Sequence, residues 1–174
     1  WVNITTATTS GAWPTKRYAH ACTLKHDHMY IVGGYDDNGD TLDVYDAGED
    51  LWVLNLLTMT WASIALTDSN GFTSVSSNLP ASDGFAHASL FPYGDNQLLY
   101  VSTLHVAANE KRIWFIDLDD EEWIHAGDSD DTDAPGEYEE VPAVIRKGKY
   151  VLFCGGKVDS SSSSSYQGCI AFNL

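Results

Sequence analysis

The sequence predicts an all-β protein in which a unit of about sixty residues recurs along the chain. Tryptophan gives the register of this repeat, because "WVNI", "WASI" and "WIHA" begin at Trp1, Trp61 and Trp123, 60 and 62 residues apart. Glycine supplies a second observation, since "YIVGG" and "FCGG" both end an apolar run in a glycine pair. A third is the proline-led pattern shared by "PTKRYAHACTL" and "PASDGFAHASL", and more distantly by "PGEYEEVPAVI".

Each unit is predicted to contain four short strands separated by turn residues. In the first unit these strands cover residues 20–24, 29–32, 51–56 and 61–64. The runs "MYIV" and "LWVL" are apolar at successive residues rather than at alternate ones, so both faces of each small sheet should be covered. Sheets stacked face to face in a ring meet this requirement, and four strands per unit of this length indicate a β-propeller.

Gly33 and Gly34 stand at the end of a predicted strand, where glycine weakens pairing. We therefore expect the backbone there to adopt a positive φ, or another segment to approach it closely. The same reasoning applies to Gly155 and Gly156. The acidic stretch that follows the first pair should be a surface loop.

The Arg-x-x-His of "RYAH", the glycine pair of "YIVGG", the run "LWVLNL" and the spaced Trp61 together resemble a kelch repeat. The resemblance covers essentially the whole chain, although "YVSTLH" replaces the glycine pair in the second unit and the third unit lacks the Arg and the His. It implies a kelch-type β-propeller, with three four-stranded blades of an incomplete or multi-chain ring. Residues 1–174 would form a single propeller segment, in which residues 1–4 are the outer strand of a preceding blade, 17–64 blade one, 83–126 blade two, and 138–174 blade three without its last strand.

Three blades are too few to close a ring, since closed propellers have about four to eight. An open stack would leave apolar sheet faces exposed and prone to association. We therefore expect the remaining blades to lie on further chain. The alternative is a head-to-tail pair of copies, in which each lends its Trp1 strand to the other.

The long predicted loops, residues 35–50, 65–82, 126–139 and 157–168, should emerge on one face of the disc, where binding chemistry usually lies. Two stretches, residues 35–50 and 126–140, carry 14 of the 25 acidic residues. We expect this acidic face to bind a protein partner of basic character. The residues assigned to it are Tyr35, Asp36, Asp37, Asn38, Asp40, Asp43, Asp128, Asp130, Asp131 and Asp133.

The formal net charge of -16 opposes binding to nucleic acid and to anionic membrane surfaces. No apolar run approaches the ~20 residues that span a bilayer, so membrane insertion is not expected. The alternative interpretation is that the charge serves only solubility or suits a saline environment.

The spacing of Asp36, Asn38 and Asp40 resembles the start of a calcium loop, because alternate oxygens can converge on a hard cation. Gly39 comes too early for an EF-hand, however, and Ala47 stands where the bidentate Glu would be. The alternative is a solvated acidic loop, and we expect no other cofactor.

The three cysteines fit no zinc-binding spacing. Cys154 and Cys169 precede and follow the same predicted loop, so they either form a cross-strand disulfide or remain buried free thiols. Cys22 should stay free. Localisation rests on the sequon at Asn3, which favours a secreted or extracellular protein.

No motif for nucleophilic, zinc or phosphate chemistry occurs in the sequence, so an interaction module is expected rather than an enzyme. His26 and His28 flank a turn residue and are either solvated or in contact with a metal. His20 and His87 should be structural rather than proton-transferring. The alternatives are a fragment of a copper enzyme resembling galactose oxidase and a glycan-binding propeller. The sequence shows no recognisable set of residues for the tyrosine–cysteine crosslink and histidine ligands of that copper enzyme.

Overall fold

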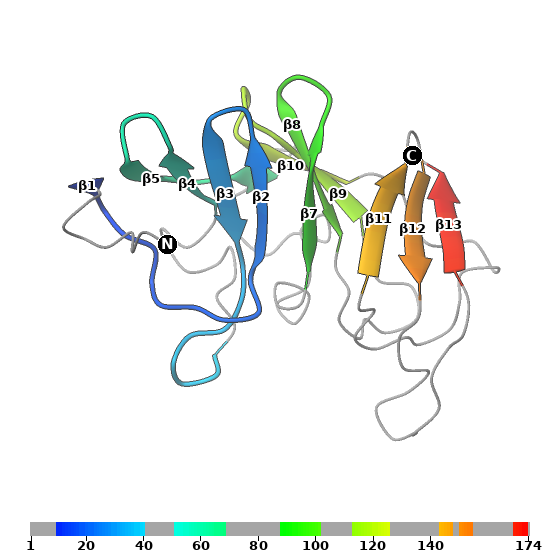
Figure 1. The fold of residues 1–174 in the computed structure, drawn as a ribbon, viewed down its shortest axis with the longest axis horizontal. Coiled ribbons are helices and arrows are strands. Elements are labelled where there is room, and N and C mark those ends of the chain that lie inside the picture. Colours follow the sequence, from blue (N-terminus) through cyan, green and yellow to red (C-terminus); the bar gives the residue numbers. More distant parts are fainter. Residues whose placement is uncertain are drawn as a thin grey trace.

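Three β-sheets follow one another along the chain in a computed structural model of the protein (Figure 1). The structure describes residues 10–40, 51–68, 88–101, 113–125, 143–147, 150–154 and 169–173. Within these ranges every helix or strand is a β-strand, so the all-β prediction is confirmed. No helix in the described part of the chain is long and apolar enough to cross a membrane.

The strand order is β1-β5-β4-β3-β2 in the first sheet, β6-β10-β9-β8-β7 in the second and β11-β12-β13 in the third. The first sheet contains β1 (Ser10–Gly11), β2 (Ala21–Lys25), β3 (His28–Val32), β4 (Leu51–Asn55) and β5 (Thr60–Ile64). The second contains β6 (Thr67–Asp68), β7 (Ser89–Tyr93), β8 (Gln97–Val101), β9 (Ile113–Asp117) and β10 (Glu122–His125). The third contains β11 (Ala143–Lys147), β12 (Tyr150–Cys154) and β13 (Cys169–Asn173).

The four strands expected in the first unit are present as β2 to β5, an antiparallel meander. The first two sheets nevertheless have five strands rather than four, because β1 pairs parallel with β5 and β6 pairs parallel with β10. Each added strand has two residues, which is too short to show an apolar period. These residues form strands because they pair with the outer strand of a meander, β5 or β10, and not because of their local sequence. The strand expected at residues 1–4 lies outside the described residues.

An Asn or Asp closes the turn after the third strand of both meanders. Asn55 Oδ1 accepts the backbone N–H groups two and three residues ahead, both at 2.9 Å. Asp117 Oδ1 accepts the equivalent two at 3.0 and 3.2 Å. The other polar atom of each side chain makes a hydrogen bond to the neighbouring strand. Asn55 Nδ2 is bonded to His28 Nε2 at 3.2 Å, and Asp117 Oδ2 accepts a hydrogen bond from Gln97 Nε2 at 2.9 Å. These turns explain why "LNL" and "IDL" recur at this point of the repeat.

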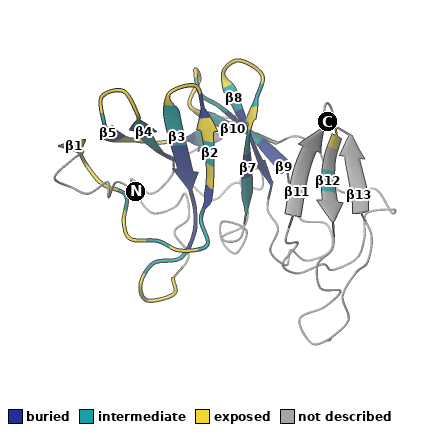
Figure 2. Ribbon diagram, in the orientation of Figure 1, coloured by how far each residue is buried: buried dark blue, intermediate teal, exposed yellow. Residues whose placement is uncertain are grey.

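The main hydrophobic core lies between the first two sheets, and Figure 2 shows buried segments in the strands of both. Four successive β8 residues, Leu98, Leu99, Tyr100 and Val101, are fully buried. Leu98 and Tyr100 belong to the core shared with the first sheet, whereas Leu99 and Val101 belong to a separate cluster. Alternate residues of a strand lie on opposite faces, so both faces of the second sheet are covered, as the consecutive apolar residues of the repeat predict.

Lys25, the last residue of β2, is a charged residue buried at the junction of the two sheets, with 6% of its surface exposed. Its Nζ donates to three backbone carbonyls at the β7–β8 turn, those of Tyr93 at 3.0 Å, Gly94 at 2.9 Å and Gln97 at 3.1 Å. An ammonium group has three N–H donors, so this set replaces the hydration that burial removes. Lys25 thereby holds β2 against β7.

We predict that Lys25→Met lowers the free energy of unfolding by about 2–4 kcal/mol, because it leaves three carbonyls without their charged donor. Denaturant unfolding measures this change. Lys16→Met is the matched control, since the Lys16 side chain is 84% exposed and pairs with Asp37 at 3.3 Å. The control should lose less than about 1 kcal/mol. Equal losses in the two variants would contradict the role given to Lys25.

Candidate binding surface at the exit of β3

The chain leaves β3 through Gly33 and Gly34, whose φ angles are 65° and 102°. A Cβ atom on Gly34 would lie 2.6 Å from the backbone oxygen of Tyr18 and 3.0 Å from the Cβ of His20. Both reasons that the sequence offered for glycine, a positive φ and a close approach, are therefore found at Gly34.

Beyond the glycine pair, the segment that leaves β3 and the segment that leads into β2 come together again at Tyr18 and Tyr35. Tyr18 N donates to Tyr35 O at 3.0 Å, and Tyr35 N donates to Tyr18 O at 2.9 Å. The two rings lie with their centroids 5.3 Å apart. Arg17 Nη1 donates to Gly33 O at 3.0 Å, so the "RYAH" segment holds the start of the loop in place.

His20 lies in the same segment and is half-buried. Burial, together with the positive charge of Arg17, lowers the pKa of the His20 imidazole. The neutral ring is favoured, which agrees with a structural histidine.

Asp36 organises the turn that follows. Its Oδ1 accepts the backbone N–H groups of Asn38 at 2.8 Å and Asp40 at 2.9 Å, and its Oδ2 accepts the Asn38 side-chain amide at 3.0 Å. A main-chain pair, Asp36 N to Asp40 O at 2.9 Å, closes the loop. The bond from the Asp40 N–H is the main reason why the pKa of the Asp36 carboxyl is lowered.

The resulting surface combines aromatic and acidic side chains. Tyr18 is 54% exposed, and its hydroxyl oxygen lies 3.8 Å from the point that a Cβ on Gly39 would occupy. The Tyr18 ring therefore lies beside the Asp36 turn as well as beside Tyr35. We call this the Tyr18 surface, and its members are Tyr18, Tyr35, Asp36, Asp37, Asn38 and Asp40.

The structure brings together five of the ten residues that the sequence assigned to a binding face, namely Tyr35, Asp36, Asp37, Asn38 and Asp40. The other five, Asp43, Asp128, Asp130, Asp131 and Asp133, lie outside the described residues. The joining of the two acidic stretches into one face stays a prediction. Tyr18 was missed, although its place inside "RYAH", next to the glycine pair in the meander, could have indicated it.

A calcium site at Asp36, Asn38 and Asp40 also stays a prediction. Both carboxylate oxygens of Asp36 accept hydrogen bonds from the loop itself. Among the described residues, no cluster of three or more His, Cys, Asp or Glu side chains could hold a metal ion.

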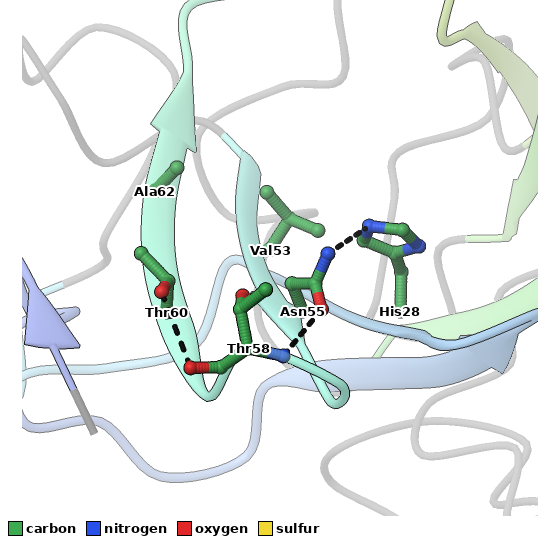
Figure 3. Close-up of a pocket in the computed structure, with 6 residues that line it drawn as sticks. All are labelled: His28, Val53, Asn55, Thr58, Thr60 and Ala62. Atoms are coloured by element: carbon green, nitrogen blue, oxygen red, sulfur yellow. Dashed lines mark hydrogen bonds between the residues drawn. The ribbon is translucent and has the colours of Figure 1, made fainter.

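A recess lies on the first sheet and has a volume of about 340 Å³ (Figure 3). It is lined by His28, Val53, Asn55, Thr58, Thr60 and Ala62. Because Asn55 Oδ1 already accepts backbone N–H groups, its Nδ2 must donate to His28 Nε2, which leaves the His28 proton on Nδ1. His28 and Asn55 are thus part of the turn structure, and the recess presents few polar groups to a ligand.

The third sheet places Cys154 and Cys169 directly opposite each other, at the end of β12 and the start of β13. Antiparallel partners have Cα atoms about 4.5–5.5 Å apart, which falls within the range for disulfides. This pairing fits the predicted cross-strand disulfide, which remains a prediction. Cys22 is an exposed free cysteine.

Tandem sheets built mainly of antiparallel strands, with a glycine-bounded loop, give the described part of the chain an all-β architecture. No family model and no curated protein matches the sequence. Among solved structures, the fold is similar to that of YjhT, a kelch-repeat β-propeller protein, with a TM-score of 0.51 and 13% sequence identity.

The match to YjhT covers 82% of this chain and 45% of that one, so the chain spans less than half the length of YjhT. A likeness at this level of identity shows the fold alone. It supports the kelch resemblance as a statement about architecture, while the described sheets do not close into a ring.

We predict that the Asp36 turn weakens at low pH. Since the pKa of Asp36 is lowered in the folded protein, its stabilising effect is present above the ordinary value of 3.8 and is lost as the pH falls through the lowered value. Hydrogen-exchange protection of the Asn38 and Asp40 amides should fall in that range. Asp36→Asn, which keeps one acceptor oxygen, should remove the pH dependence, and Asp36→Ala should remove the protection itself. Full protection in Asp36→Ala would show that the turn does not depend on this carboxylate.

A separate prediction applies if the protein is extracellular. Cys154 and Cys169 should then be joined, closing a loop of about 16 residues that adds roughly 3 kcal/mol in the chain-entropy model. Peptide mapping under non-reducing conditions should find this pair joined and Cys22 unmodified. Three free thiols in the native secreted protein would rule the disulfide out.

Proposed function

We propose that the protein is a kelch-type interaction module that binds a basic segment of a partner protein at the Tyr18 surface. In this proposal the three sheets are blades of a propeller whose other blades are supplied elsewhere. The observation that carries the proposal is the juxtaposition of a half-exposed Tyr18, its neighbour Tyr35 and the acidic turn at Asp36.

A lysine or arginine of the partner fits this surface for two physical reasons. Cations are attracted to tyrosine rings, with a gain of about 0.5–2 kcal/mol. The Asp37 carboxylate is 71% exposed and pairs with Lys16 in an ion pair of the kind that contributes at most about 1 kcal/mol. An incoming cation can therefore take the place of Lys16 at little cost.

The loop is also held in shape before any partner arrives. Three hydrogen bonds to the Asp36 carboxylate and the paired backbone of Tyr18 and Tyr35 order it. Binding to an ordered loop loses less conformational entropy than binding to a flexible one. The net charge of -16 adds a long-range attraction that draws basic partners to the protein.

The test is a titration of the protein with an arginine-rich peptide, with the contact mapped by NMR. Tyr18→Ala should weaken binding about 3- to 30-fold, the range that the loss of a cation–ring contact gives. Tyr150→Ala is the matched control, because Tyr150 is a 42% exposed tyrosine on the third sheet. Asp37→Asn should also weaken binding, whereas Asp120→Asn in the β9–β10 turn should not.

Raising the ionic strength should weaken binding steeply, because exposed charges are screened over about 8 Å at physiological salt. Affinity that does not change with salt, or chemical-shift changes confined to the β4–β5 and β9–β10 turns, would contradict the proposal. Stoichiometric copper in the purified protein would favour the oxidase-like alternative, and binding to an uncharged oligosaccharide at the Tyr18 surface would favour a glycan-binding propeller.

A further inference from the structure

The turn from Asp36 to Asp40 contains a chemically reactive dipeptide, Asn38–Gly39. Asparagine is one of the residues that are chemically least stable in proteins. Its side-chain amide can be attacked by the backbone nitrogen of the next residue, and glycine at that place has no Cβ atom to obstruct the approach. Asn38 and Gly39 are both exposed, so water and hydroxide reach them. The dipeptide is therefore a candidate site of spontaneous covalent modification.

The hydrogen bonds of the turn engage both nitrogens that take part in this reaction. Asn38 Nδ2, the nitrogen that would leave, donates to Asp36 Oδ2 at 3.0 Å. Gly39 N, the nitrogen that would attack, donates to the backbone oxygen of Asp36 at 3.1 Å. The Gly39 nitrogen must lose its proton before it can attack, and the bond to Asp36 O holds that proton in place. The closed turn therefore opposes the reaction.

The Asp36 carboxylate is the group that keeps the turn closed. Besides the Asn38 side chain, it accepts the backbone N–H groups of Asn38 and Asp40 at 2.8 and 2.9 Å. Gly39 has a φ of 87°, a conformation that glycine adopts without strain and that lets the chain return to Asp40. Loss of this one carboxylate would remove three hydrogen bonds from a turn of five residues. The reactivity of Asn38 should therefore depend on Asp36.

We propose that Asn38–Gly39 is a self-modification site that the Asp36 carboxylate restrains, and that the completed reaction leaves the turn permanently open. When the turn opens, Gly39 N gives its proton to hydroxide and attacks Asn38 Cγ. The new C–N bond closes a ring, the Cγ–Nδ2 bond breaks, and Nδ2 takes a proton from water and leaves as ammonia. Water then opens the ring at either carbonyl carbon, and the new carboxylic acid loses its proton to solvent. The product is aspartate or isoaspartate at position 38.

The product cannot rebuild the turn. The Asn38 amide, which donates to Asp36 Oδ2, is replaced by a carboxylate, and an ionised carboxylate only accepts hydrogen bonds. Two carboxylates would then face each other where a 3.0 Å hydrogen bond now lies, and like charges at such a distance repel. Isoaspartate also adds a carbon atom to the backbone, which moves the Asp40 N–H away from Asp36 Oδ1. The modification therefore acts in one direction.

The reaction belongs to the turn itself, so the inference does not rest on the proposed function. Its consequence would nevertheless be felt at the Tyr18 surface, because the Tyr18 hydroxyl lies 3.8 Å from the point that a Cβ on Gly39 would occupy. A modified chain gains a negative charge there and loses the ordered loop that the surface offers to a partner. The Asp36 carboxylate thus determines how long the surface keeps its shape.

The test incubates the protein at mildly alkaline pH and follows the deamidation of Asn38 by peptide mapping, with a synthetic peptide of residues 34–42 as the unstructured reference. Asn38 in the protein should react about tenfold or more slowly than in the peptide, because hydrogen bonds to a charged group must first open. Asp36→Ala should bring the rate in the protein close to that of a peptide with the same change. The other Asn–Gly pair of the chain, Asn70–Gly71, is the internal control, and its rate should not respond to Asp36→Ala.

Asn38→Asp makes one of the two products directly and tests the consequence without waiting for the reaction. The Asp40 amide of this variant should lose its hydrogen-exchange protection while circular dichroism and the unfolding curve stay unchanged. Asn96→Asp adds the same charge in the β7–β8 turn and is the matched control, which should leave the Asp40 amide protected. Equal Asn38 rates in the natural chain and the peptide, no acceleration in Asp36→Ala, or full Asp40 protection in Asn38→Asp would each overturn the proposal.

Discussion

The arrangement of the first two sheets depends on one buried cation. The Lys25 ammonium crosses from β2 to the β7–β8 turn and donates to three backbone carbonyls of the second sheet. A buried ammonium costs several kcal/mol when it has no partners, so it is tolerated only where all of its donors find acceptors in good geometry. Apolar packing between the sheets is strong but not directional. The Lys25 contact fixes how the two sheets are oriented, because its ammonium can reach all three acceptors in only one relative placement of β2 and β7.

This junction connects the core to the candidate binding surface. β2 and β3 carry Lys25 at one end and the Tyr18 and Tyr35 pair at the other, about one strand length away. Fixing the turn end against the second sheet therefore also fixes the end from which the Tyr18 surface emerges. The glycine pair lets the chain leave β3 there without breaking the pairing of Tyr18 with Tyr35.

Much of the fold could be predicted from local patterns in the sequence. Consecutive apolar residues such as "LWVL" predict strands covered on both faces, and the Trp spacing predicts the repeat. Gly34 could be assigned its role in advance, because few environments other than a positive φ or a close backbone contact favour glycine at a strand end. The short strands β1 and β6 could not be predicted, since two residues carry no period and their pairing depends on the tertiary structure.

In the candidate site, too, some features could be predicted from local sequence patterns and others depend on the tertiary structure. The acidic turn was visible in the sequence because its carboxylates are contiguous, and Asp36 stands at the start of it. Tyr18 and Lys25 were not identified, because their roles depend on partners 17 and 68 or more residues away in the chain, such as Tyr35 and Tyr93. A lysine at the end of a strand looks like an ordinary surface residue until the neighbouring sheet is placed beside it.

We infer that Lys25 makes the first two sheets a single cooperative unit, and native-state hydrogen exchange can test this claim. The slowest amides of β3 and β8 should exchange with the same opening free energy in the natural chain, because both are released only when the junction opens. In Lys25→Met the two values should separate. Different opening free energies for β3 and β8 in the natural chain, or equal ones that persist in Lys25→Met, would contradict the claim.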